Sequence, residues 1–479
     1  MIFGAVDVDS WSAEADLIVV GYGIAGVCGA IEAREAGGEV IVLERSSGCT
    51  GSTAVASGHF YLGGGTAVQS ACGFDDSEQA MADYWTAVTE RPDTAKIDAL
   101  AHGSVALFDW LEERGVPFDR SYFPTKAVIQ PGRECLIWTG NEKVWPYRDQ
   151  AHPAPRGHKV AFDGEEGGGA LALQKLVEHA ERVGVDVQYD MQVDALVMED
   201  GRIVGLRARH FGDHLFFGAR NGVLLAGGGF GRNEEMMARH LARFDGVTVV
   251  GGPYDDGDVI NLGVAAGGAV ENMDGMLVTS PIYPPEQLIK GILVNREGQR
   301  FIAEDCYHTR TSLAIIEQGE AYLIVDSEIF AYPAWRDHAN QQLVDGFETI
   351  AEMETRLGMP DGALLATMTN YSRHAAQGED PEFHKHPDWL KPLDKGPWAA
   401  FDFSYRRAAF YAFTLGGLRI SADGEVLDEQ GATIPGLYAA GACAAMLAHD
   451  AQNYASGISL ACGAFFGRRA GHHAVAGAL

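Results

Sequence analysis

The hydrophobic positions of this chain begin as short apolar runs that alternate with glycine turns. An apolar run over 17–20 precedes glycines, a stretch of small residues and a second apolar run that ends at Glu44. This order predicts a strand, a helix and a second, parallel strand. Apolar residues at helical spacing predict helices between 75 and 115 and over 168–184. Alternating polar and apolar positions over 185–209 predict hairpin strands, and a further apolar strand follows them.

The character of the sequence changes twice along the chain. From 275 to 413 it becomes richer in proline, aromatic residues and helical spacing. It then returns to glycine-rich strands and turns, and it closes with a predicted helix over 456–475. We therefore expect an α/β fold in which one domain, made of 1–274 and 414–479, is interrupted by an inserted α+β domain over 275–413.

Charge and composition exclude several classes of partner. The chain has 479 residues, 47% of them hydrophobic, and a formal net charge of −30, so nucleic acid and anionic membranes would repel it. No apolar run approaches the ~20 residues that span a bilayer, and the first residues do not resemble a signal peptide. Seven scattered cysteines form no C-x-x-C pair, so we expect no disulfide framework, haem attachment or metal site. We expect a soluble, cytoplasmic protein with no membrane span.

A glycine motif lies at the first strand-to-helix turn. Residues 21–26 read G-Y-G-I-A-G, which is the pattern G-x-G-x-x-G. Gly21 permits a tight turn, Gly23 lets the backbone approach a pyrophosphate, and Gly26 lets the helix pack on the strand. Glu44, at the end of the next strand, would accept hydrogen bonds from a ribose hydroxyl. The motif predicts a dinucleotide site without separating FAD from NAD.

Further glycine-rich segments separate the two cofactors. The segment GSTAVASGHF follows soon after Glu44, and LLAGGGF and GLYAAGACAA supply two more glycine turns after apolar strands. With these segments the chain resembles the FAD-dependent flavoprotein superfamily of fumarate reductase and succinate dehydrogenase over nearly its whole length. The resemblance implies a Rossmann-like FAD-binding domain with an inserted catalytic capping domain. It also implies non-covalent FAD, because Gly51-Ser52-Thr53 stands where membrane-bound members carry a flavin-linking histidine.

The resemblance also assigns contacts to the cofactor position by position. It places Val193 near the adenine and Asp258 near the flavin, and it makes Gly441 the start of the final segment. The residues that it assigns to FAD are Gly21, Gly23, Ile24, Ala25, Gly26, Glu44, Arg45, Ser52, Thr53, Ser57, Gly58, Val193, Ala226, Gly227, Asp258, Gly441, Ile458 and Ser459.

The substrate-binding cations of the dicarboxylate enzymes in this superfamily are missing. Their arginine in N-R-x-G-G aligns with Tyr454, and their histidine before T-M-G-G aligns with Phe413. Their arginine eight residues beyond R-F falls on His308. Carboxylates are best held by the planar fork of arginine, so these neutral groups argue against a dicarboxylate substrate. Two alternatives stay open, because Arg310 could slip into register and His308 could carry charge at mildly acid pH.

A large apolar substrate with one carbonyl group fits these positions better. A flavin removes a hydride from one carbon while a base removes a proton from its neighbour, and that proton is acidic only beside a polarised carbonyl. The Tyr454 hydroxyl and the N–H groups at the start of the last helix could stabilise the oxygen as its charge develops. Tyr307 and Ser456 are then candidates for receiving and relaying the proton, because a phenol with a pKa near ~10 is a poor base alone.

With Tyr307, Tyr454 and Ser456 the chain resembles the 3-ketosteroid Δ4-(5α)-dehydrogenases. The resemblance implies oxidation of a neutral 5α-3-ketosteroid to the 4-ene-3-ketone, with hydride passing from C5 to flavin N5 and the proton leaving C4. The electron acceptor, the steroid side chain and the direction in the cell stay open. The Δ1-dehydrogenases usually carry Y-P-G-P-G where this chain reads Y-A-S-G, which disfavours Δ1 chemistry. Δ1-dehydrogenation, an enoate reductase like fumarate reductase, and a non-catalytic flavin-binding module remain alternatives.

Each candidate residue also has a purely structural interpretation. Tyr307 could pack at the domain junction, Tyr454 could be a core tyrosine, and Ser456 could cap the last helix. His59 could touch the flavin or simply pack in the interior. The irregular aromatic segment 118–150 could line the pocket or belong to the core.

Overall fold

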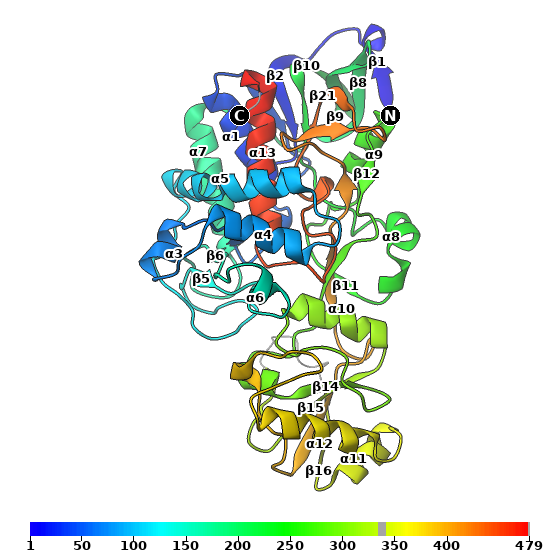
Figure 1. Ribbon diagram of the computed structural model, residues 1–479. Helices are drawn as coiled ribbons and strands as arrows, with labels where there is room; N and C mark the ends of the chain where they lie inside the picture. The colour runs from blue at the N-terminus through cyan, green and yellow to red at the C-terminus, as the bar shows by residue number, and fades with distance from the viewer. Residues whose placement is uncertain (334–341, 478–479) are drawn as a thin grey trace.

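The computed structural model describes residues 1–333 and 342–477. The molecule is elongated, with a larger upper part that holds both termini and a smaller lower part (Figure 1). A nine-stranded sheet forms the framework of the upper part in the order β1-β8-β9-β10-β2-β3-β7, with β21 beside β10 and β20 beside β21. Its strands are β1 (Ile2–Gly4), β2 (Ala13–Val20), β3 (Val40–Leu43), β7 (Asp186–Gln188), β8 (Gln192–Glu199), β9 (Arg202–His210), β10 (Asp213–Leu225), β20 (Glu425–Leu427) and β21 (Thr433–Ala439).

The predicted strand, helix and strand at the start of the chain are confirmed as β2, α1 (Ile24–Glu35) and β3. Strand β2 pairs in parallel with β3 and with β10, so it lies in the middle of the sheet. Leu17, Ile18 and Val19 are fully buried there. A parallel strand that is covered on both faces needs such a continuous apolar run, which explains the pattern in the sequence.

Helix α13 (Ile458–Ala476) packs along α1, as Figure 1 shows for the red helix beside the blue one. Glycines allow this close approach. A Cβ atom on Gly467 would lie 2.3 Å from the Ala25 carbonyl oxygen, and one on Gly471 would lie 2.1 Å from the Gly29 carbonyl oxygen. The two helices are thereby held together along their length, so the first turn of α13 has a fixed position next to the glycine motif.

The other helices predicted in the first part of the chain are also present. They are α4 (Glu78–Val88), α5 (Thr94–Glu113) and α7 (Gly168–Val183). A small sheet in the order β4-β6-β5 joins three distant segments. Its strands are β4 (His59–Tyr61), β5 (Leu136–Ile137) and β6 (Gly157–Lys159). Other short elements of the chain are α2 (Ser52–Val55), α3 (Ala67–Ala71), α6 (Tyr147–Gln150), α8 (Glu234–His240), α9 (Asp258–Ala265), β12 (Val270–Glu271) and β19 (Gly417–Leu418).

The lower part of the molecule has its own sheet and its own buried cluster of apolar side chains. The sheet has the order β14-β15-β17-β16, and the cluster extends from Ile282 to Phe410 with Val128 and Val144 added from the first segment. The elements are β14 (Ile292–Asn295), β15 (Ala321–Asp326), β16 (Leu343–Phe347), β17 (Trp398–Asp402), α10 (His308–Gln318), α11 (Ile350–Leu357) and α12 (Ala363–Ala375).

A short three-stranded ribbon, β11-β18-β13, joins the two parts. Its strands are β11 (Thr248–Val249), β13 (Met276–Thr279) and β18 (Tyr411–Thr414). Met276, Leu277 and Val278 belong to the upper apolar cluster, although they follow the expected boundary at 275. The division into 1–274, 275–413 and 414–479 stays our proposal for the domains, and the ribbon shows that the chain crosses between them as paired strands.

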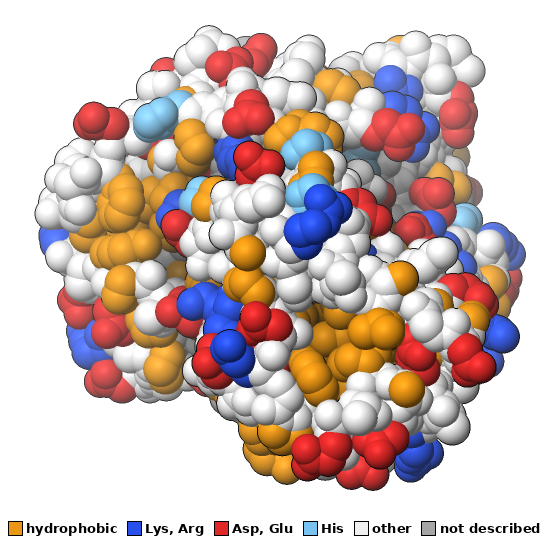
Figure 2. Space-filling model, turned by 60° about the horizontal axis from the view of Figure 1, so that its bottom comes forward, with side chains coloured by type: hydrophobic (Ala, Val, Ile, Leu, Met, Phe, Trp, Pro, Cys, Tyr) orange, Lys and Arg blue, Asp and Glu red, His pale blue; other side chains and the backbone are white. Residues whose placement is uncertain are grey.

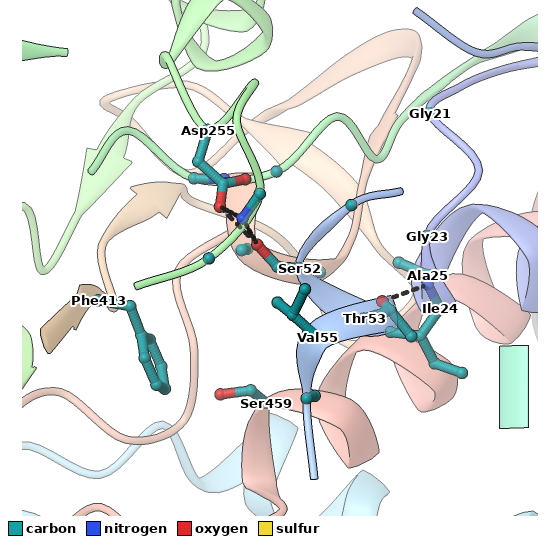
Figure 3. Close-up of a pocket in the computed structure, with 18 of the residues that line it drawn as sticks. Gly21, Gly23, Ile24, Ala25, Ser52, Thr53, Val55, Asp255, Phe413 and Ser459 are labelled. Atoms are coloured by element: carbon teal, nitrogen blue, oxygen red, sulfur yellow. Dashed lines mark hydrogen bonds between the residues drawn. The ribbon is translucent and has the colours of Figure 1, made fainter. Parts of the chain in front are cut away.

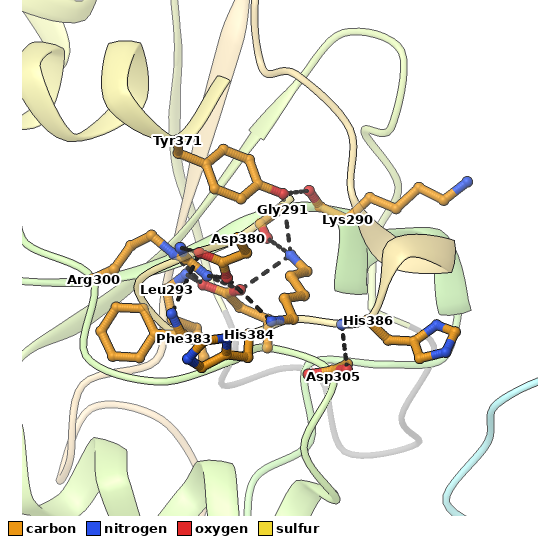
Figure 4. Close-up of polar contacts among 12 residues, drawn as sticks. Lys290, Gly291, Leu293, Arg300, Asp305, Tyr371, Asp380, Phe383, His384 and His386 are labelled. Atoms are coloured by element: carbon orange, nitrogen blue, oxygen red, sulfur yellow. Dashed lines mark hydrogen bonds and ion pairs between the residues drawn. The ribbon is translucent and has the colours of Figure 1, made fainter. Parts of the chain in front are cut away.

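Four buried charged residues form a cluster of ion pairs in the lower part, close to the segment that leads into α10 (Figure 4). The Arg300 guanidinium binds both Glu304 and Asp380 in pairs of hydrogen bonds of 2.9 to 3.1 Å. Lys385 lies 3.1 Å from Glu304, so two positive and two negative groups balance. Because an unpaired buried charge is costly, this pairing ties the loop that carries Asp380 and Lys385 to the start of α10.

Charged side chains of both signs are spread over the surface. On the face drawn in Figure 2, blue Lys and Arg side chains stand singly among red Asp and Glu side chains and form no basic patch. Among the helices that the structure describes, none is long and apolar enough to cross a bilayer. The described residues also contain no group of three or more His, Cys, Asp or Glu side chains that could hold a metal ion.

Candidate active site

A long cavity follows the carboxyl-terminal edge of the upper sheet. The turns that follow β2, β3, β10 and β21 all line it, through Gly21, Glu44, Ala226 and Gly441 respectively. Open α/β sheets bind ligands at this edge, because parallel strands point their loops into one crevice. In Figure 3, Gly21 and Gly23 lie on one side of the segment that carries Ser52, Thr53 and Val55, while Phe413 and Ser459 lie on the other.

The glycine motif forms a cradle that larger residues would fill. Gly21 has φ +99°, and a Cβ atom there would lie 2.5 Å from the Ala226 carbonyl oxygen. A Cβ atom on Gly26 would lie 1.9 Å from the Gly21 carbonyl oxygen. Gly23 caps α1, which places the N-terminus of the helix at the cavity. This backbone is shaped for the close approach of a pyrophosphate at a helix N-terminus.

Glu44 is held in place by the protein and keeps room for a ligand. One carboxylate oxygen accepts the Tyr22 N–H at 2.8 Å. The other accepts the Ser46 N–H at 2.8 Å and the Ser46 hydroxyl at 2.7 Å. A carboxylate offers about four acceptor positions, so one remains for a ribose hydroxyl. The residues present therefore fit the ribose and pyrophosphate of a dinucleotide.

Asp258 lies at the Glu44 end of the cavity, which differs from its expected place near the flavin. Its carboxylate is 3.6 Å from the Arg45 guanidinium, which also pairs with Asp256 and lies 4.6 Å from the centre of the Tyr254 ring. Arg45 directly follows Glu44, so this ion-pair group belongs to the adenosine end. The sequence motif could not reveal this, because the loop that carries Asp256 and Asp258 reaches the site only in the folded chain.

The segment after Glu44 is fixed to both walls of the cavity. The Thr53 hydroxyl accepts the Ile24 N–H at 3.0 Å and so occupies one donor at the start of α1. The Ser52 hydroxyl donates to Asp255 and accepts the Gly252 N–H at 2.7 Å (Figure 3). Sequence reasoning missed Asp255, although the glycines just before it, after a short apolar run, indicate a turn close to a ligand.

The other residues assigned to the cofactor are placed in two ways. Those that line the cavity are Ala25, Ser57, Val193, Gly227 and Ser459. Gly26, Gly58 and Ile458 do not line it, and they shape it by packing behind its wall. Gly58 is an example, because a Cβ atom there would lie 2.5 Å from the Gly168 carbonyl carbon.

At the opposite end of the cavity, Tyr454 is buried against an apolar neighbour. Its ring packs edge-on against Phe413, with 5.7 Å between the ring centres. Its hydroxyl lies 3.1 Å from the Ser459 hydroxyl. Burial raises the pKa of Tyr454, so the phenol stays protonated and can donate a hydrogen bond. The first turn of α13 lines the cavity beside it, and the N–H groups of such a turn lack intrahelical partners.

Ser456 forms part of the cavity wall, and Tyr307 lies behind that wall. Ser456 lines the cavity, whereas Tyr307 does not, and it is 1% exposed. Burial, reinforced by the neighbouring Tyr283, raises the pKa of Tyr307 well above its ordinary value, and the nearby Ser456 hydroxyl opposes this rise. The contact with Ser456 is not a hydrogen bond of normal geometry, and the Tyr307 hydroxyl has no other partner in the part of the chain that the structure describes.

His308 is buried, and its imidazole is neutral. Its Nδ1 atom lies 2.6 Å from the Thr279 hydroxyl, and its Nε2 atom has no partner among the described residues. Burial lowers the pKa of His308 to about 3, which argues against the alternative of a charged imidazole at mildly acid pH. Arg310 does not rescue a cation either, because it does not line the cavity and its guanidinium lies over the Tyr147 ring.

The charges along the cavity are therefore unequally distributed. Among the described residues that line it, Arg45 is the one Lys or Arg side chain, and it lies at the Glu44 end. His59 lines the cavity between Ser57 and Gln130, and burial lowers its pKa to about 4. The Tyr454 end therefore has no positive charge for a carboxylate.

Segment 118–150 contributes less to the cavity than its aromatic residues suggest. Its contacts with the cavity come from Val128 and Ile129. Phe118 and Tyr147 pack in the apolar core instead. Apolar residues still line the Tyr454 end, but they come mainly from other segments, such as Phe413 and Met446.

Comparison with known proteins agrees with this geometry. The family described as "FAD binding domain" matches residues 16–460. A solved structure of 3-ketosteroid-Δ4-(5α)-dehydrogenase from Rhodococcus jostii RHA1, in complex with 4-androstene-3,17-dione, is 41% identical with a TM-score of 0.93 and covers 99% of each chain.

Two curated relatives are more distant in sequence. The 3-oxo-5-alpha-steroid 4-dehydrogenase of Comamonas testosteroni is 27% identical over 91% of this chain and 94% of its own length. The NADH:acrylate oxidoreductase of Vibrio harveyi is 28% identical over 72% of this chain, which spans only 33% of that enzyme. The chain therefore belongs to the FAD-binding-domain family of flavoproteins, with FAD as its cofactor, and within it to the family of the Rhodococcus jostii steroid dehydrogenase.

Proposed function

We propose that the protein is a non-covalent FAD enzyme that oxidises 5α-3-ketosteroids to 4-ene-3-ketosteroids. The observation that carries this proposal is the Tyr454 end of the cavity, which combines hydroxyl groups with apolar walls and has no cation among its described residues. A neutral steroid with a single reacting ketone matches that lining. The 41% identical relative was solved with a steroid of this type, which supports the same substrate class for this chain.

Tyr454 binds the ketone oxygen in this proposal. Its hydroxyl is protonated because burial raises its pKa, and the Ser459 hydroxyl 3.1 Å away orients it. The N–H groups in the first turn of α13 lie beside it as fixed donors. Donors that are already in place stabilise the negative charge that develops on the oxygen as C4 loses its proton.

Tyr307 and Ser456 take up the C4 proton and pass it on to solvent. Neither side chain is a strong base alone, and the raised pKa of Tyr307 makes a free tyrosinate unfavourable. A relay avoids that charge, because Tyr307 and Ser456 can each accept one proton while releasing another. Bound FAD supplies the acceptor for the hydride that leaves C5.

The position of the new double bond tests the proposal. Purified enzyme with FAD is incubated with 5α-androstane-3,17-dione and an artificial electron acceptor, and the product is identified by mass spectrometry against authentic Δ1 and Δ4 standards. We expect 4-androstene-3,17-dione. A Δ1 product, or reduction of a dicarboxylate or acrylate without any steroid turnover, would contradict the proposal.

Partners and location belong to the same proposal. Electrons that the flavin takes up pass on to an electron acceptor. The seven cysteines are all free in the described structure, and a cytoplasmic location stays a proposal.

A further inference from the structure

One short segment contacts both of the loops that carry the proposed proton-handling residues. The Ser456 N–H donates to the Thr139 carbonyl oxygen at 2.8 Å. The Tyr307 N–H donates to the Asn141 side-chain oxygen, Oδ1, at 2.8 Å. We call residues 139–141 the strap, because Ser456 lies just before α13, Tyr307 lies just before α10, and these three residues connect the two loops.

Both polar atoms of the Asn141 side chain form hydrogen bonds within the protein. It is fully buried, and neither Asn141 nor Thr139 lines the cavity. The Asn141 Nδ2 group donates to the Gln452 carbonyl oxygen at 3.4 Å, and the Asn141 N–H donates to the Tyr84 hydroxyl at 2.8 Å. A buried amide needs such partners, because burying it without them costs on the order of 1–3 kcal/mol in mutational data. Asn141 therefore acts on the reaction only through the residues that it holds.

The position of Tyr307 relative to Ser456 matters more than the docking of the two parts as a whole. Proton transfer needs donor and acceptor about 2.6–3.2 Å apart, and a misplacement of about 1 Å can cost on the order of a hundredfold in rate. A second bond across the same junction, from the Thr309 hydroxyl to the Ala451 carbonyl oxygen, has a length of 2.8 Å. That bond holds α10 against the 451–456 loop but does not contact the Tyr307 backbone.

We propose that Asn141 is a positioning residue that sets the distance between the Tyr307 and Ser456 hydroxyls through the strap. The proposal rests on the proposed function, since it assumes that these two residues move the C4 proton. Replacing Asn141 with leucine keeps the number and branching of the side-chain heavy atoms and removes both side-chain hydrogen bonds. Replacing it with aspartate keeps an oxygen at the Oδ1 position in either protonation state and so restores the bond to Tyr307.

The test uses three measurements on the enzyme with bound FAD. The first is flavin content, the second is the Kd of the product 4-androstene-3,17-dione from the change in flavin absorbance, and the third is the anaerobic rate of flavin reduction. The third measurement uses 5α-androstane-3,17-dione with hydrogen and with deuterium at C4. For Asn141→Leu we expect normal flavin content, a Kd within about threefold of wild type, a rate lower by about a hundredfold, and a larger C4 isotope effect.

Two further variants separate positioning from general loosening. Asn141→Asp should recover most of the rate and the wild-type isotope effect, and Thr309→Val should stay within about threefold of wild type in rate. If Asn141→Leu does not fold, Asn141→Ser replaces it, because its hydroxyl is too short to reach the Tyr307 N–H.

Three results would overturn the inference, and they differ from failure of the proposed function. An unchanged rate in Asn141→Leu would do so. A second such result is an unchanged C4 isotope effect in Asn141→Leu, with a rate that falls only in proportion to a rise in Kd. A third is a loss of rate in Thr309→Val equal to that in Asn141→Leu. If no 5α-3-ketosteroid reduces the wild-type flavin, the proposed function itself fails, and the role given to Asn141 fails with it.

Discussion

The two ends of the cavity are built in different ways. At the Glu44 end, glycine backbone, a helix N-terminus and a carboxylate come from one continuous stretch between Gly21 and Glu44. At the Tyr454 end, the lining comes from β13, α10, β18 and α13, which are far apart in the sequence. The first end carries charge in Glu44, Arg45 and Asp258, whereas the second has no Lys or Arg among its described residues. The groups that fit the ribose and pyrophosphate are therefore local in the sequence, whereas the Tyr454 end depends on the assembled fold.

The largest expected effect is the loss of FAD binding when the glycine turn at the Glu44 end is altered. In Gly26→Ala the new methyl group would meet the Gly21 carbonyl oxygen at 1.9 Å, so the turn that receives the pyrophosphate must move. We expect protein purified without flavin, measured as the ratio of absorbance at the flavin and protein bands. Gly48→Ala is the matched control, because a Cβ atom there has no neighbour within 4 Å. Normal flavin content in Gly26→Ala would contradict the assignment of this end.

The next largest effect is a loss of turnover, with FAD binding retained, when the Tyr454 end is altered. Tyr454→Phe keeps the packing against Phe413 and removes the hydroxyl that we propose as a donor to the ketone oxygen. Removal of such a donor costs about 10²–10³ in kcat. We expect this loss in steroid turnover with normal FAD content, measured by steady-state kinetics. Turnover equal to wild type would make Tyr454 a core residue.

Sequence reasoning succeeded where a pattern is short and local. The G-x-G-x-x-G motif requires glycine at specific turns, and a buried parallel strand requires an apolar run, so the cofactor end could be predicted in detail. It failed where contacts depend on the tertiary fold. Asp255 and the placement of Asp258 come from a loop more than two hundred residues after the motif, and nothing local indicates which end of the cavity that loop contacts.

Charge states were a second limit of the sequence. His308 aligns with a cation position, and its ordinary pKa would allow charge near neutral pH. Only burial, which a sequence does not report, lowers the pKa of His308 to about 3. The contacts of Thr139 and Asn141 could not be predicted from the sequence either, because they join segments that no periodicity connects.

A smaller effect is the pH dependence of the free energy of unfolding, which arises from buried histidines. Burial lowers the pKa values of His59 and His158 to about 4 and of His308 to about 3, all below the ordinary value. Between the ordinary value of about 6.5 and these lowered values, the unfolded chain binds more protons, so stability falls as pH falls. We expect the free energy of unfolding to decrease by about 1.4 kcal/mol per pH unit for each such group, measured by urea denaturation.

One substitution checks this pH dependence. His308→Phe should make the slope smaller, because it removes one of the imidazoles whose pKa burial lowers. An unchanged slope in His308→Phe would show that this imidazole is not buried as a neutral group.

The smallest effect concerns the second hydroxyl beside the ketone site. Ser459→Ala removes the partner of the Tyr454 hydroxyl at 3.1 Å and leaves Tyr454 in place. The net worth of such a hydrogen bond is about 0.5–1.5 kcal/mol, so we expect a rate loss of about two- to tenfold. A loss as large as that of Tyr454→Phe would instead place Ser459 on the substrate oxygen.

The most direct test of the neutral substrate end compares two titrations of the same anaerobic enzyme. One uses 5α-androstane-3,17-dione, and the other uses succinate, which carries two carboxylates and needs the cations that the described lining of the Tyr454 end lacks. Flavin absorbance reports reduction in both. We predict bleaching by the steroid and no change with succinate. Bleaching by succinate, with no response to the steroid, would contradict the account.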